Sequence, residues 1–529
     1  MAEAKGTKRK TRRFWPWAAL AGVVSAGAFL AVAELVALLV GSGASPILAV
    51  GSFVIDIVPR WAKEFAIEVF GANDKLFLLL SLAIAVVIAA AVAGVVEYIR
   101  RPFGAVIIGL AGVVAIAATV TRAGASPLVA IPSVLGAVVG IVLLSLLIPR
   151  LRTWRDSTAP AVATGAGSAA PAKAVGRRGF LRLTVIAGAA SLVVGVGARL
   201  VSVATSSIGK VRDALKLPEP ASRVTLPDGA ELDVEGLSSL VTANKDFYRV
   251  DTALTVPSVD PETWTLTIDG MVGETVTLTF DDLVAMGLDE YMITLTCVSN
   301  EVGGSLLGNA VWQGIPIRDV LALASPDSSA DMVLSRSVDG FTASTPISAL
   351  TDPDLDAILA VAMNGEPLPL EHGFPVRMLV PGLYGYVSAT KWLSGLTVTT
   401  FAKDEAYWTP RGYSAEAPIK LSSRIDTPRI DKALAAGPAK IAGMAWAQPV
   451  GVGAVEVQID DGDWQPATMS TPVNGATWVQ WVIDWQAETG THYVAVRATD
   501  VNGTVQTEER ASIAPNGSSG LQRTLIRVT

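Results

Sequence analysis

The single cysteine of this chain, Cys297, is the residue whose chemistry the rest of the sequence restricts most. It lies between a strand-like segment, 291–296, and a loop that contains Gly303 and Gly304. One thiol cannot form an intramolecular disulfide or, alone, a cysteine-rich zinc or iron–sulfur site. Cys297 is therefore a buried inert thiol, a nucleophile, or one thiolate ligand to a metal held mainly by other groups.

A second group of chemically capable residues lies between positions 363 and 393. Amide, imidazole, guanidinium, hydroxyl and ammonium groups follow one another there among glycines and prolines: Asn364, His372, Arg377, Ser388 and Lys391. Such groups bind anions, because Arg offers a fork for phosphate and Lys a point charge. A solvated polar loop is the alternative. The embedded apolar segment 376–380 favours a binding site.

Histidine is scarce in this chain. It occurs twice, at His372 and His492, and both positions lie in the second half. The apolar first half has neither His nor Cys, so it cannot hold a bis-histidine haem or an iron–sulfur cluster. We interpret His492 as structural, because it begins the alternating, strand-like segment 492–497.

Charge and hydropathy divide the chain near residue 205. Residues 1–205 carry a net charge of +12 and the remainder −19. The first part is dominated by Ala, Val, Leu, Ile and Gly, whereas the second is typical of soluble protein. An acidic soluble half argues against nucleic-acid binding, which needs a basic face, and would suit a cationic protein partner.

Five apolar stretches in the first part are long enough, or nearly so, to cross a membrane as helices. They are 14–40, 76–98, 104–122, 127–149 and 180–204. The stretch 46–70 is interrupted by charged residues and predicts an interfacial segment. Among the acidic residues, Glu34 lies within a span and is a candidate for a functional role, whereas Asp56 and Glu97 lie near segment ends.

Lys and Arg residues indicate the orientation of these spans. They concentrate before the first span, between the second and third, and between the fourth and fifth. Since basic residues favour the cytoplasmic side, the N-terminus is predicted to be cytoplasmic and everything after about residue 205 extracytoplasmic. The chain would then contact membrane lipid.

A low-complexity linker at 157–175 leads into a basic segment, 176–182, that precedes the fifth span. Its Arg177, Arg178 and Phe180 resemble an internal twin-arginine export signal. That route carries folded proteins, so it would suit a domain that receives its cofactor in the cytoplasm. The alternative is a basic flank that only fixes the topology.

The soluble half predicts an α+β domain followed by an all-β unit. Strands are expected at 264–270, 276–280 and 291–296, with a short capped helix at 281–286. The third strand brings Cys297 to its end, a suitable place for a functional site. Alternating segments within 425–529 predict an immunoglobulin-like sandwich; they are 455–459, 478–483 and 492–497.

Taken together, several motifs of residues 240–529 resemble the sulfite oxidase family of molybdopterin enzymes. They are Asn244-Lys-Asp-Phe-Tyr-Arg249, the lone Cys297 after a strand, Met363-Asn-Gly-Glu-Pro-Leu368, His372-Gly-x-Pro-x-Arg377, Pro381-Gly-x-Tyr-Gly385 and Lys391-Trp392. The resemblance implies a molybdopterin-dependent oxidoreductase.

The resemblance also implies roles for individual residues. Cys297 would be the molybdenum ligand, with further sulfurs supplied by the pterin. The pterin and its phosphate would be held by Asn364, His372, Arg377, Ser388 and Lys391. Tyr248 and Arg249 would line the same pocket, and either Thr342 or Ser344 would contribute. Tyr413 is either the family's active-site tyrosine or a packed aromatic residue; with Arg411 it would offer donors near a metal-bound oxygen.

The sequence departs from animal and plant members of the family just after the cysteine. Those members have arginines there that help to recognise the sulfite anion, whereas this chain has Glu301, Val302, Gly303 and Gly304. Glu301 is expected to repel a dianion, which argues against sulfite as the substrate. The haem domain that some members carry is also missing.

These observations predict five segments in the chain. They are a four-span membrane region (1–150), a linker with the fifth span (151–205), a second linker (206–234), the catalytic domain (235–424) and a sandwich that resembles the family's dimerisation domain (425–529). Molybdopterin would be the only redox centre, so electrons would pass to or from a separate cytochrome or quinone-linked protein. A homodimer is possible.

Two functions from other classes remain open on the sequence alone. The chain could be a non-catalytic membrane receptor or sensor that retains the fold and binds through its sandwich. The five spans could also form a transporter or sensor that the outer domain regulates.

Overall fold

The computed structural model describes residues 13–40, 45–58, 74–121, 127–158, 173–204 and 208–529. The chain forms two compact units, residues 1–207 with 253–255, and residues 208–252 with 256–529. We describe each unit by itself.

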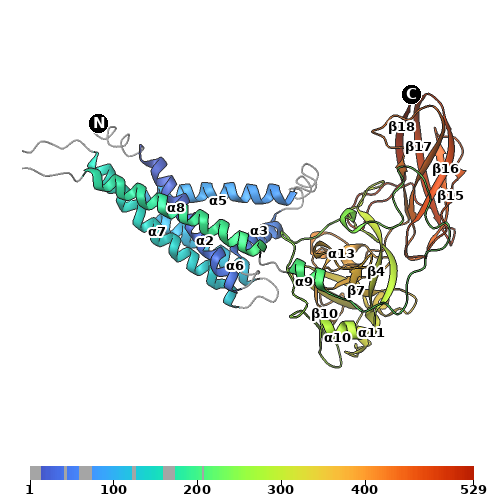
Figure 1. The fold of residues 1–529 in the computed structure, drawn as a ribbon, viewed down its shortest axis with the longest axis horizontal. Helices are drawn as coiled ribbons and strands as arrows, with labels where there is room; N and C mark the ends of the chain where they lie inside the picture. The colour runs from blue at the N-terminus through green and yellow to red at the C-terminus, as the bar shows by residue number, and fades with distance from the viewer. Residues whose placement is uncertain (1–12, 41–44, 59–73, 122–126, 159–172, 205–207) are drawn as a thin grey trace, which may run out of the picture. The chain divides into compact units, whose positions relative to one another are not determined.

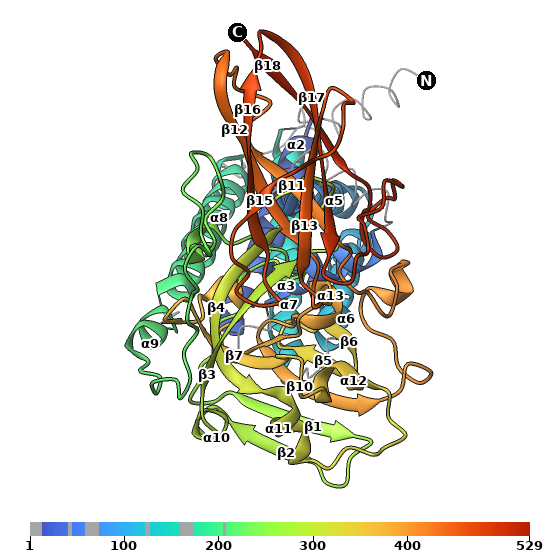
Figure 2. The same cartoon turned by 90° about the vertical axis from the view of Figure 1, so that its right-hand side faces the viewer.

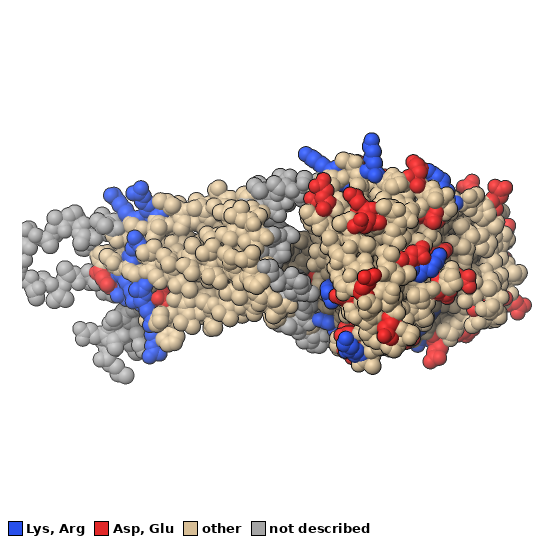
Figure 3. All heavy atoms as spheres, turned by 90° about the horizontal axis from the view of Figure 1, so that it is seen from below, with Lys and Arg blue, Asp and Glu red and all other residues tan. Residues whose placement is uncertain are grey.

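The first unit consists mainly of long apolar helices that run side by side (Figure 1). Among the described residues, five helices are long and apolar enough to cross a membrane, and they match the five predicted stretches. They are α2 (Trp15–Val40), α5 (Asp74–Ile99), α6 (Phe103–Val120), α7 (Ile131–Ser157) and α8 (Lys173–Ala204). On the face seen in Figure 3, charge is largely absent along the helices, and Lys and Arg gather at one end.

Small residues let these helices approach closely. Helix α2 packs against α5, α7 and α8. A Cβ added to Gly22 of α2 would lie 2.0 Å from the Ala90 carbonyl oxygen of α5, and one added to Gly136 of α7 would lie 2.4 Å from the Phe29 ring. Larger side chains at either glycine would therefore separate the helices, as is usual where apolar helices pack through small residues.

Two acidic residues of this unit serve as helix caps. Glu34 accepts hydrogen bonds from Ser45 Oγ (2.7 Å) and Ile47 N (3.5 Å) at the start of α3 (Pro46–Ile57). Glu97 accepts from Gly104 N (2.9 Å) and Ala105 N (3.1 Å) at the start of α6. Both carboxylates therefore satisfy amide groups that a helix start leaves unpaired.

The prediction of an interfacial segment at 46–70 is tested only in part. Its first portion forms helix α3. Residues 59–70 and the Asp56 side chain lie outside the described structure.

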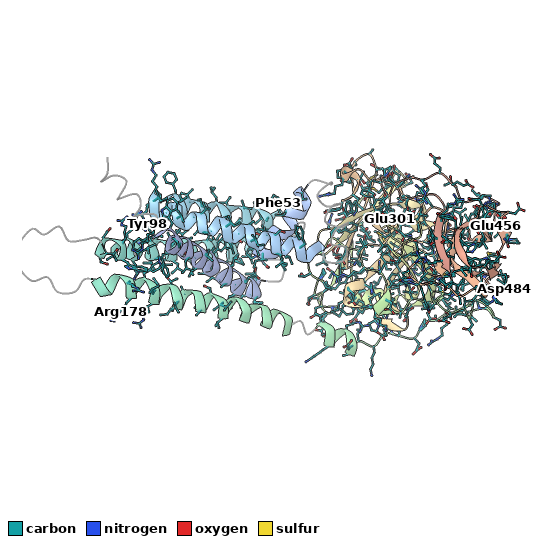
Figure 4. The ribbon with its side chains drawn as sticks, turned by 90° about the horizontal axis from the view of Figure 1, so that it is seen from above. Phe53, Tyr98, Arg178, Glu301, Glu456 and Asp484 are labelled. Atoms are coloured by element: carbon teal, nitrogen blue, oxygen red, sulfur yellow. The ribbon has the colours of Figure 1, made fainter. Side chains whose placement is uncertain are left out.

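The basic segment 176–182 forms part of α8. Its Phe180 is fully buried between Trp17 and Trp154, with ring centroids at 6.3 Å and 6.0 Å. The Arg177 guanidinium carbon lies 5.6 Å from the centre of the Trp154 ring, a cation–π arrangement. Figure 4 shows Arg178 and Tyr98 towards the same end of the helical unit. Export through the twin-arginine route stays a prediction.

The second unit contains two five-stranded sheets that position the site. One has the order β2-β1-β10-β5-β6, in which β1 and β10 are parallel and the other pairs antiparallel. Its strands are β1 (Thr265–Gly270), β2 (Val276–Thr279), β5 (Met332–Ser337), β6 (Thr342–Pro346) and β10 (Leu393–Thr399).

The other sheet has the order β3-β4-β7-β8, with β9 beside β7. Its strands are β3 (Asp289–Thr296), β4 (Leu307–Pro316), β7 (Ile358–Met363), β8 (Glu366–Pro367) and β9 (Arg377–Leu379).

Short helices and turns connect these strands. They are α9 (Ile208–Ala214), η4 (Asn244–Asp246), α10 (Phe280–Ala285), α11 (Ile317–Ala322), α12 (Ile347–Thr351), η5 (Leu370–His372), α13 (Gly385–Ser388) and η6 (Thr409–Arg411). The predicted strands and the capped helix are confirmed: Thr279 accepts from Asp282 N and begins α10 with a capping box. Cys297 follows β3 directly, as predicted.

Residues after 421 form two stacked antiparallel sheets at one end of this unit (Figure 2). Their orders are β11-β12-β16-β15 and β14-β13-β17-β18. The strands are β11 (Ser422–Thr427), β12 (Gly437–Trp446), β13 (Val452–Ile459), β14 (Gln465–Pro466), β15 (Thr468–Met469), β16 (Val479–Ala487), β17 (Gly490–Asp500) and β18 (Gln522–Val528). The three predicted strands are confirmed, while membership of the immunoglobulin class stays a prediction.

The lone histidine of this part, His492, has a structural role, as predicted. Its Nδ1 lies 2.6 Å from Asp460 Oδ2 and its Nε2 lies 2.8 Å from the Glu488 carbonyl oxygen.

The stacked sheets also hold the chain on both sides of Cys297. Gln448 Nε2 donates to the Thr294 carbonyl oxygen (2.8 Å), and Trp478 N donates to Thr294 Oγ1 (2.9 Å). Beyond the cysteine, Ser518 Oγ donates to the Asn300 carbonyl oxygen (2.7 Å). Strand β3 and the loop after it are therefore fixed from the C-terminal part of the chain.

Candidate functional site

The thiol of Cys297 is buried at the end of β3, with 8% of the residue exposed. Its backbone N donates to the Leu306 carbonyl oxygen (2.9 Å), and Ser299 N donates to its Sγ (3.4 Å). Burial raises the pKa of the thiol, so the free cysteine is protonated at neutral pH. No group of three or more His, Cys, Asp or Glu side chains is placed to hold a metal within the described part of the chain. A metal at Cys297 would need ligands from elsewhere.

Arg377 begins β9 and is a buried cation. Its Nη1 donates to the His372 carbonyl oxygen (3.1 Å), whereas its Nε has no hydrogen-bond partner among the described residues. Burial lowers the pKa of its guanidinium to about 10, which still leaves it charged at neutral pH. A buried charge with an unused donor is costly unless an anion meets it.

His372 lies in η5, five residues before Arg377. Its Nε2 lies 3.1 Å from the Asn244 carbonyl oxygen, so Nε2 carries the proton and donates, while Nδ1 is left as an acceptor. Burial, and then the charge of Arg377, lower its pKa to about 4. The imidazole is therefore neutral at neutral pH.

Gly373 allows His372, Arg377 and Lys391 to lie close together. Its φ is +113°, and a Cβ there would lie 3.0 Å from Arg377 Cβ and 3.1 Å from Lys391 Cα. Any larger residue would adopt a strained backbone and separate the two cations from the histidine.

Lys391 is a second buried cation, and it has a carboxylate partner. Its Nζ donates to Asp251 Oδ2 (2.8 Å) and to the Glu371 carbonyl oxygen (3.1 Å). Burial lowers its pKa to about 8, and Asp251 opposes that shift. The same Asp251 oxygen accepts from Arg249 Nε (2.8 Å), and the Asp251 side chain is only 4% exposed.

These groups border one cavity that encloses about 910 Å³ of empty space, part of it open to solvent. Six of the predicted site residues line it: Tyr248, Cys297, His372, Arg377, Lys391 and Tyr413. Burial raises the pKa of Tyr248, so its hydroxyl stays protonated.

The other predicted site residues do not line this cavity. Asn364 has a φ of +52°, and its side chain accepts from Val311 N and donates to Thr242 O and Asn244 Oδ1. Ser388 Oγ donates to the carbonyl oxygens of Leu383 and Tyr384.

Arg249 is exposed and pairs with Asp251, whereas Arg411 stacks on Tyr407, with its guanidinium carbon 3.7 Å from the ring centre. Thr342 and Ser344 also lie outside the lining and bond to nearby backbone groups.

Several lining residues were not predicted from the sequence. They include two acids, Asp251 and Asp339, and aromatic residues such as Phe341, Tyr386 and Trp408. In the sequence, Asp251 could have been predicted to lie in the site from its position two residues after Arg249, which was itself predicted to line the pocket. Glu301, in contrast, is exposed and does not line the cavity, so the expected repulsion of a dianion cannot come from direct contact with its side chain.

Comparison with known proteins identifies a domain in the part of the chain that forms most of this cavity. Residues 253–408 match the model of the oxidoreductase molybdopterin binding domain. The chain is 30% identical over 345 residues to mitochondrial sulfite oxidase of Mus musculus, covering 56% of this chain and 63% of that protein. It is 31% identical over 178 residues to the NADH nitrate reductase of Spinacia oleracea, covering 29% and 19%.

The match contains Cys297, His372, Arg377 and Lys391. Residues 253–408 belong to the family of oxidoreductase molybdopterin binding domains, and the chain is similar to sulfite oxidases. Its molybdopterin domain excludes Tyr248, Asp251 and Tyr413, which complete the cavity from outside the matched residues.

The whole chain is not equivalent to these relatives. It spans 63% of the length of the mouse enzyme and 52% of human mitochondrial sulfite oxidase, to which it is 30% identical over 46% of its own length. Among solved structures, sulfane dehydrogenase SoxCD from Paracoccus pantotrophus aligns with a TM-score of 0.49 and 20% identity, covering 59% of this chain and 90% of that chain.

The neutral His372 predicts a specific acid sensitivity of the cofactor-free protein. Its pKa is about 4 in the folded state and 6.5 ordinarily, so between these values the unfolded chain binds more protons. Stability is therefore lost as the pH falls from 6.5 to 4, by roughly 3 kcal/mol at most. Thermal unfolding of the wild type and of His372→Gln should diverge across this range, the variant losing less. Parallel pH profiles would contradict the assignment.

Proposed function

We propose that this chain is a membrane-anchored molybdopterin oxidoreductase that transfers an oxygen atom or two electrons to or from a small extracytoplasmic molecule. The family supports the cofactor. One observation carries the site: the Cys297 thiol and the incompletely paired Arg377 guanidinium border the same cavity. A sulfur donor and a buried cation are what a metal bound to an anionic organic group requires.

The residues present fit the cofactor. Arg377 and Lys391 supply charge for a phosphate, and the unused Nε of Arg377 provides a donor without breaking an existing bond. His372 supplies a neutral acceptor at Nδ1. Metal binding at Cys297 would displace the thiol proton and so offset the cost that burial places on the thiolate.

A bound molybdenum centre supplies two-electron and oxygen-atom chemistry. The chain's own residues would orient the reactants, and Tyr413 borders the cavity beside Tyr386, with ring centroids 5.6 Å apart. We propose that Tyr413 meets the substrate and that Arg411 holds the aromatic residues in place. Asn364 and Ser388 would support the cofactor loops through their backbone contacts.

The five apolar helices support membrane anchoring, and the gathering of Lys and Arg at one end supports a cytoplasmic N-terminus. Electrons would pass to or from a separate cytochrome or quinone-linked protein, and the stacked sheets would offer a homodimer surface. In sealed right-side-out vesicles, an external protease should degrade residues 208–529 and spare the helices. Full protection of both parts would overturn the orientation.

The proposal is tested by metal and pterin analysis of the full chain, purified in detergent from a host that makes the cofactor. About one molybdenum and one pterin per chain are expected, together with turnover of sulfite, sulfoxides or N-oxides with artificial electron carriers. Protein without molybdenum and pterin, and without turnover, would support the receptor alternative instead.

A further inference from the structure

The segment that begins with Cys297 forms a closed loop, residues 297–306, which we call the thiol loop. Its two ends are joined, because Cys297 N donates to the Leu306 carbonyl oxygen (2.9 Å). Asn300 N donates to the Cys297 carbonyl oxygen (3.0 Å), and Asn300 Oδ1 accepts from Leu306 N (2.8 Å). These bonds connect the start, the middle and the end of the loop, so a shift of its far end also moves Cys297.

The thiol loop contributes directly to the cavity. Cys297, Val298 and Ser299 line it. Ser299 N donates to Cys297 Sγ at 3.4 Å. A hydrogen bond to a ligating group affects the metal that the group binds. The position of this loop therefore determines both one border of the cavity and the surroundings of the sulfur atom.

A buried cation of the C-terminal sheets holds the far end of the thiol loop. Arg424 of β11 is 7% exposed, and its Nη1 donates to the Gly304 carbonyl oxygen (3.1 Å). Its Nε donates to Asp426 Oδ1 (2.6 Å), and its Nη2 donates to Ser238 Oγ (3.0 Å). Because a guanidinium group is rigid and planar, a carboxylate that fixes Nε also fixes the direction in which Nη1 donates.

The groups around Arg424 are themselves held in place. Asp426 Oδ2 accepts from Ser238 N (3.0 Å), and the Asp426 side chain is 8% exposed. The Arg424 guanidinium carbon lies 5.9 Å from the centre of the Trp478 ring, whose Nε1 donates to the Leu240 carbonyl oxygen (2.9 Å). A buried ion pair often adds little net stability, so fixing the arrangement of its neighbours accounts for this pair better.

Arg424 reaches the thiol loop from outside the matched molybdopterin domain, residues 253–408. Two adjacent glycines allow the contact. Gly303 has a φ of +78°, and a Cβ there would lie 2.7 Å from the Gln522 side chain of β18. Only a glycine therefore lets the loop lie this close to the sheets, where Arg424 meets the carbonyl oxygen of Gly304.

We propose that Arg424 is a positioning residue for the Cys297 thiol. By bonding to Gly304, it holds the thiol loop so that the Ser299 amide stays within hydrogen-bond distance of Cys297 Sγ. The effect on a bound metal rests on the proposed function, whereas the effect on the thiol requires no cofactor. Arg424 lies outside the cavity lining, so its loss should change the reactivity of the thiol without removing a cofactor contact.

The first test uses the fact that Cys297 is the only thiol of the chain. The full chain is purified in detergent from a host that cannot make the cofactor, and its alkylation by N-ethylmaleimide is followed by mass spectrometry at one fixed pH. The variant Arg424→Met with Asp426→Asn removes the ion pair and both charges, while Asn keeps an oxygen for Ser238 N.

Alkylation of this double variant should be about tenfold faster than that of the wild type, because a hydrogen bond from a charged donor is lost. The rate should not change with urea below the unfolding transition, since a local opening exposes little surface. Arg424→Lys should give an intermediate rate, because Lys keeps the charge and loses the fork.

Two controls separate this contact from its surroundings. Ser238→Ala removes the partner of Arg424 Nη2 and leaves the bond to Gly304, so the alkylation rate should stay close to that of the wild type. Arg497→Met with Glu456→Gln removes another ion pair of the same sheets, in which Nε and Oε2 lie 2.8 Å apart, and the rate should not change.

The molybdenum-loaded full chain provides the second test. The double variant should keep its molybdenum, while kcat falls about tenfold and KM changes little, as expected for a residue that acts through a metal ligand. The electron paramagnetic resonance spectrum of the bound molybdenum should also differ from that of the wild type. A purely structural loss would lower the amount of active protein and leave that spectrum unchanged.

Each outcome bears on a separate statement. A wild-type alkylation rate in the double variant would overturn the proposal, as would a faster rate that follows global unfolding in urea or appears equally in the Arg497 control. An unchanged resonance spectrum would overturn the statement that Arg424 acts on the metal through the thiol. Protein without molybdenum from a host that makes the cofactor would overturn the proposed function, whereas the alkylation result would stand.

Discussion

Turnover is expected to fall by more than about 100-fold when Cys297 is replaced by serine, since loss of a residue that merely supports a metal ligand already costs about 10–100-fold. The fold should survive, because Ser is slightly smaller than Cys and the site is buried in an existing strand end. A shift in unfolding free energy of about 1 kcal/mol is expected from burying the hydroxyl. Molybdenum content should fall less than turnover, because Arg377, Lys391 and His372 remain.

The neighbouring residue provides a matched control. Thr296 is buried, and its Oγ1 has no hydrogen-bond partner among the described residues. Thr296→Val keeps the shape and removes only that hydroxyl, so turnover should change little. Steady-state kinetics, metal analysis and thermal unfolding curves of the wild type, Cys297→Ser and Thr296→Val measure these effects. Unimpaired turnover in Cys297→Ser would remove the thiol from the chemistry.

Replacing Arg377 by methionine is expected to separate cofactor binding from stability. The pterin and molybdenum recovered per chain should fall by at least about tenfold, because a buried guanidinium contact to phosphate is worth more than a neutral one. The cofactor-free protein should be as stable as the wild type or more stable, since the variant removes a buried charge that has no carboxylate partner among the residues that the structure describes. A residue that only supported the fold would show the reverse.

Two further variants make this result specific. Arg377→Lys should retain part of the cofactor, because Lys keeps the charge and loses the fork. Arg249→Met should retain nearly all of it, since Arg249 is exposed and outside the cavity lining. Pterin fluorescence after oxidation, metal analysis and melting curves measure the effects. Equal loss of cofactor in the Arg249 and Arg377 variants would contradict the prediction that Arg377 contacts the cofactor and Arg249 does not.

The sequence predicted the parts of the site that short motifs determine. Cys297 lies at the end of a recognisable strand, and Arg377 is linked to His372 through Gly373, whose positive φ and tight surroundings only glycine tolerates. These dependencies extend over a few residues, so they are visible without tertiary structure.

Residues whose positions depend on distant contacts could not be predicted in this way. Asp339 reaches the cavity border because a β-hairpin turn meets Thr252, which lies 87 positions away in the chain. Asp251 is placed by Lys391, 140 positions away. Asn364 shows the opposite case: its polar side chain suggested a ligand, whereas its left-handed turn conformation, which Asn tolerates well, explains the residue type.

The C-terminal sheets form hydrogen bonds to Thr294 and Asn300, and these bonds help to position the Cys297 thiol. Whatever surface they present to another protein, they also hold both ends of the segment that carries Cys297. A partner that bends these sheets would therefore alter the position of the sulfur atom. The C-terminal part of this chain is therefore not independent of the cysteine segment, because its loops donate the hydrogen bonds that position that segment.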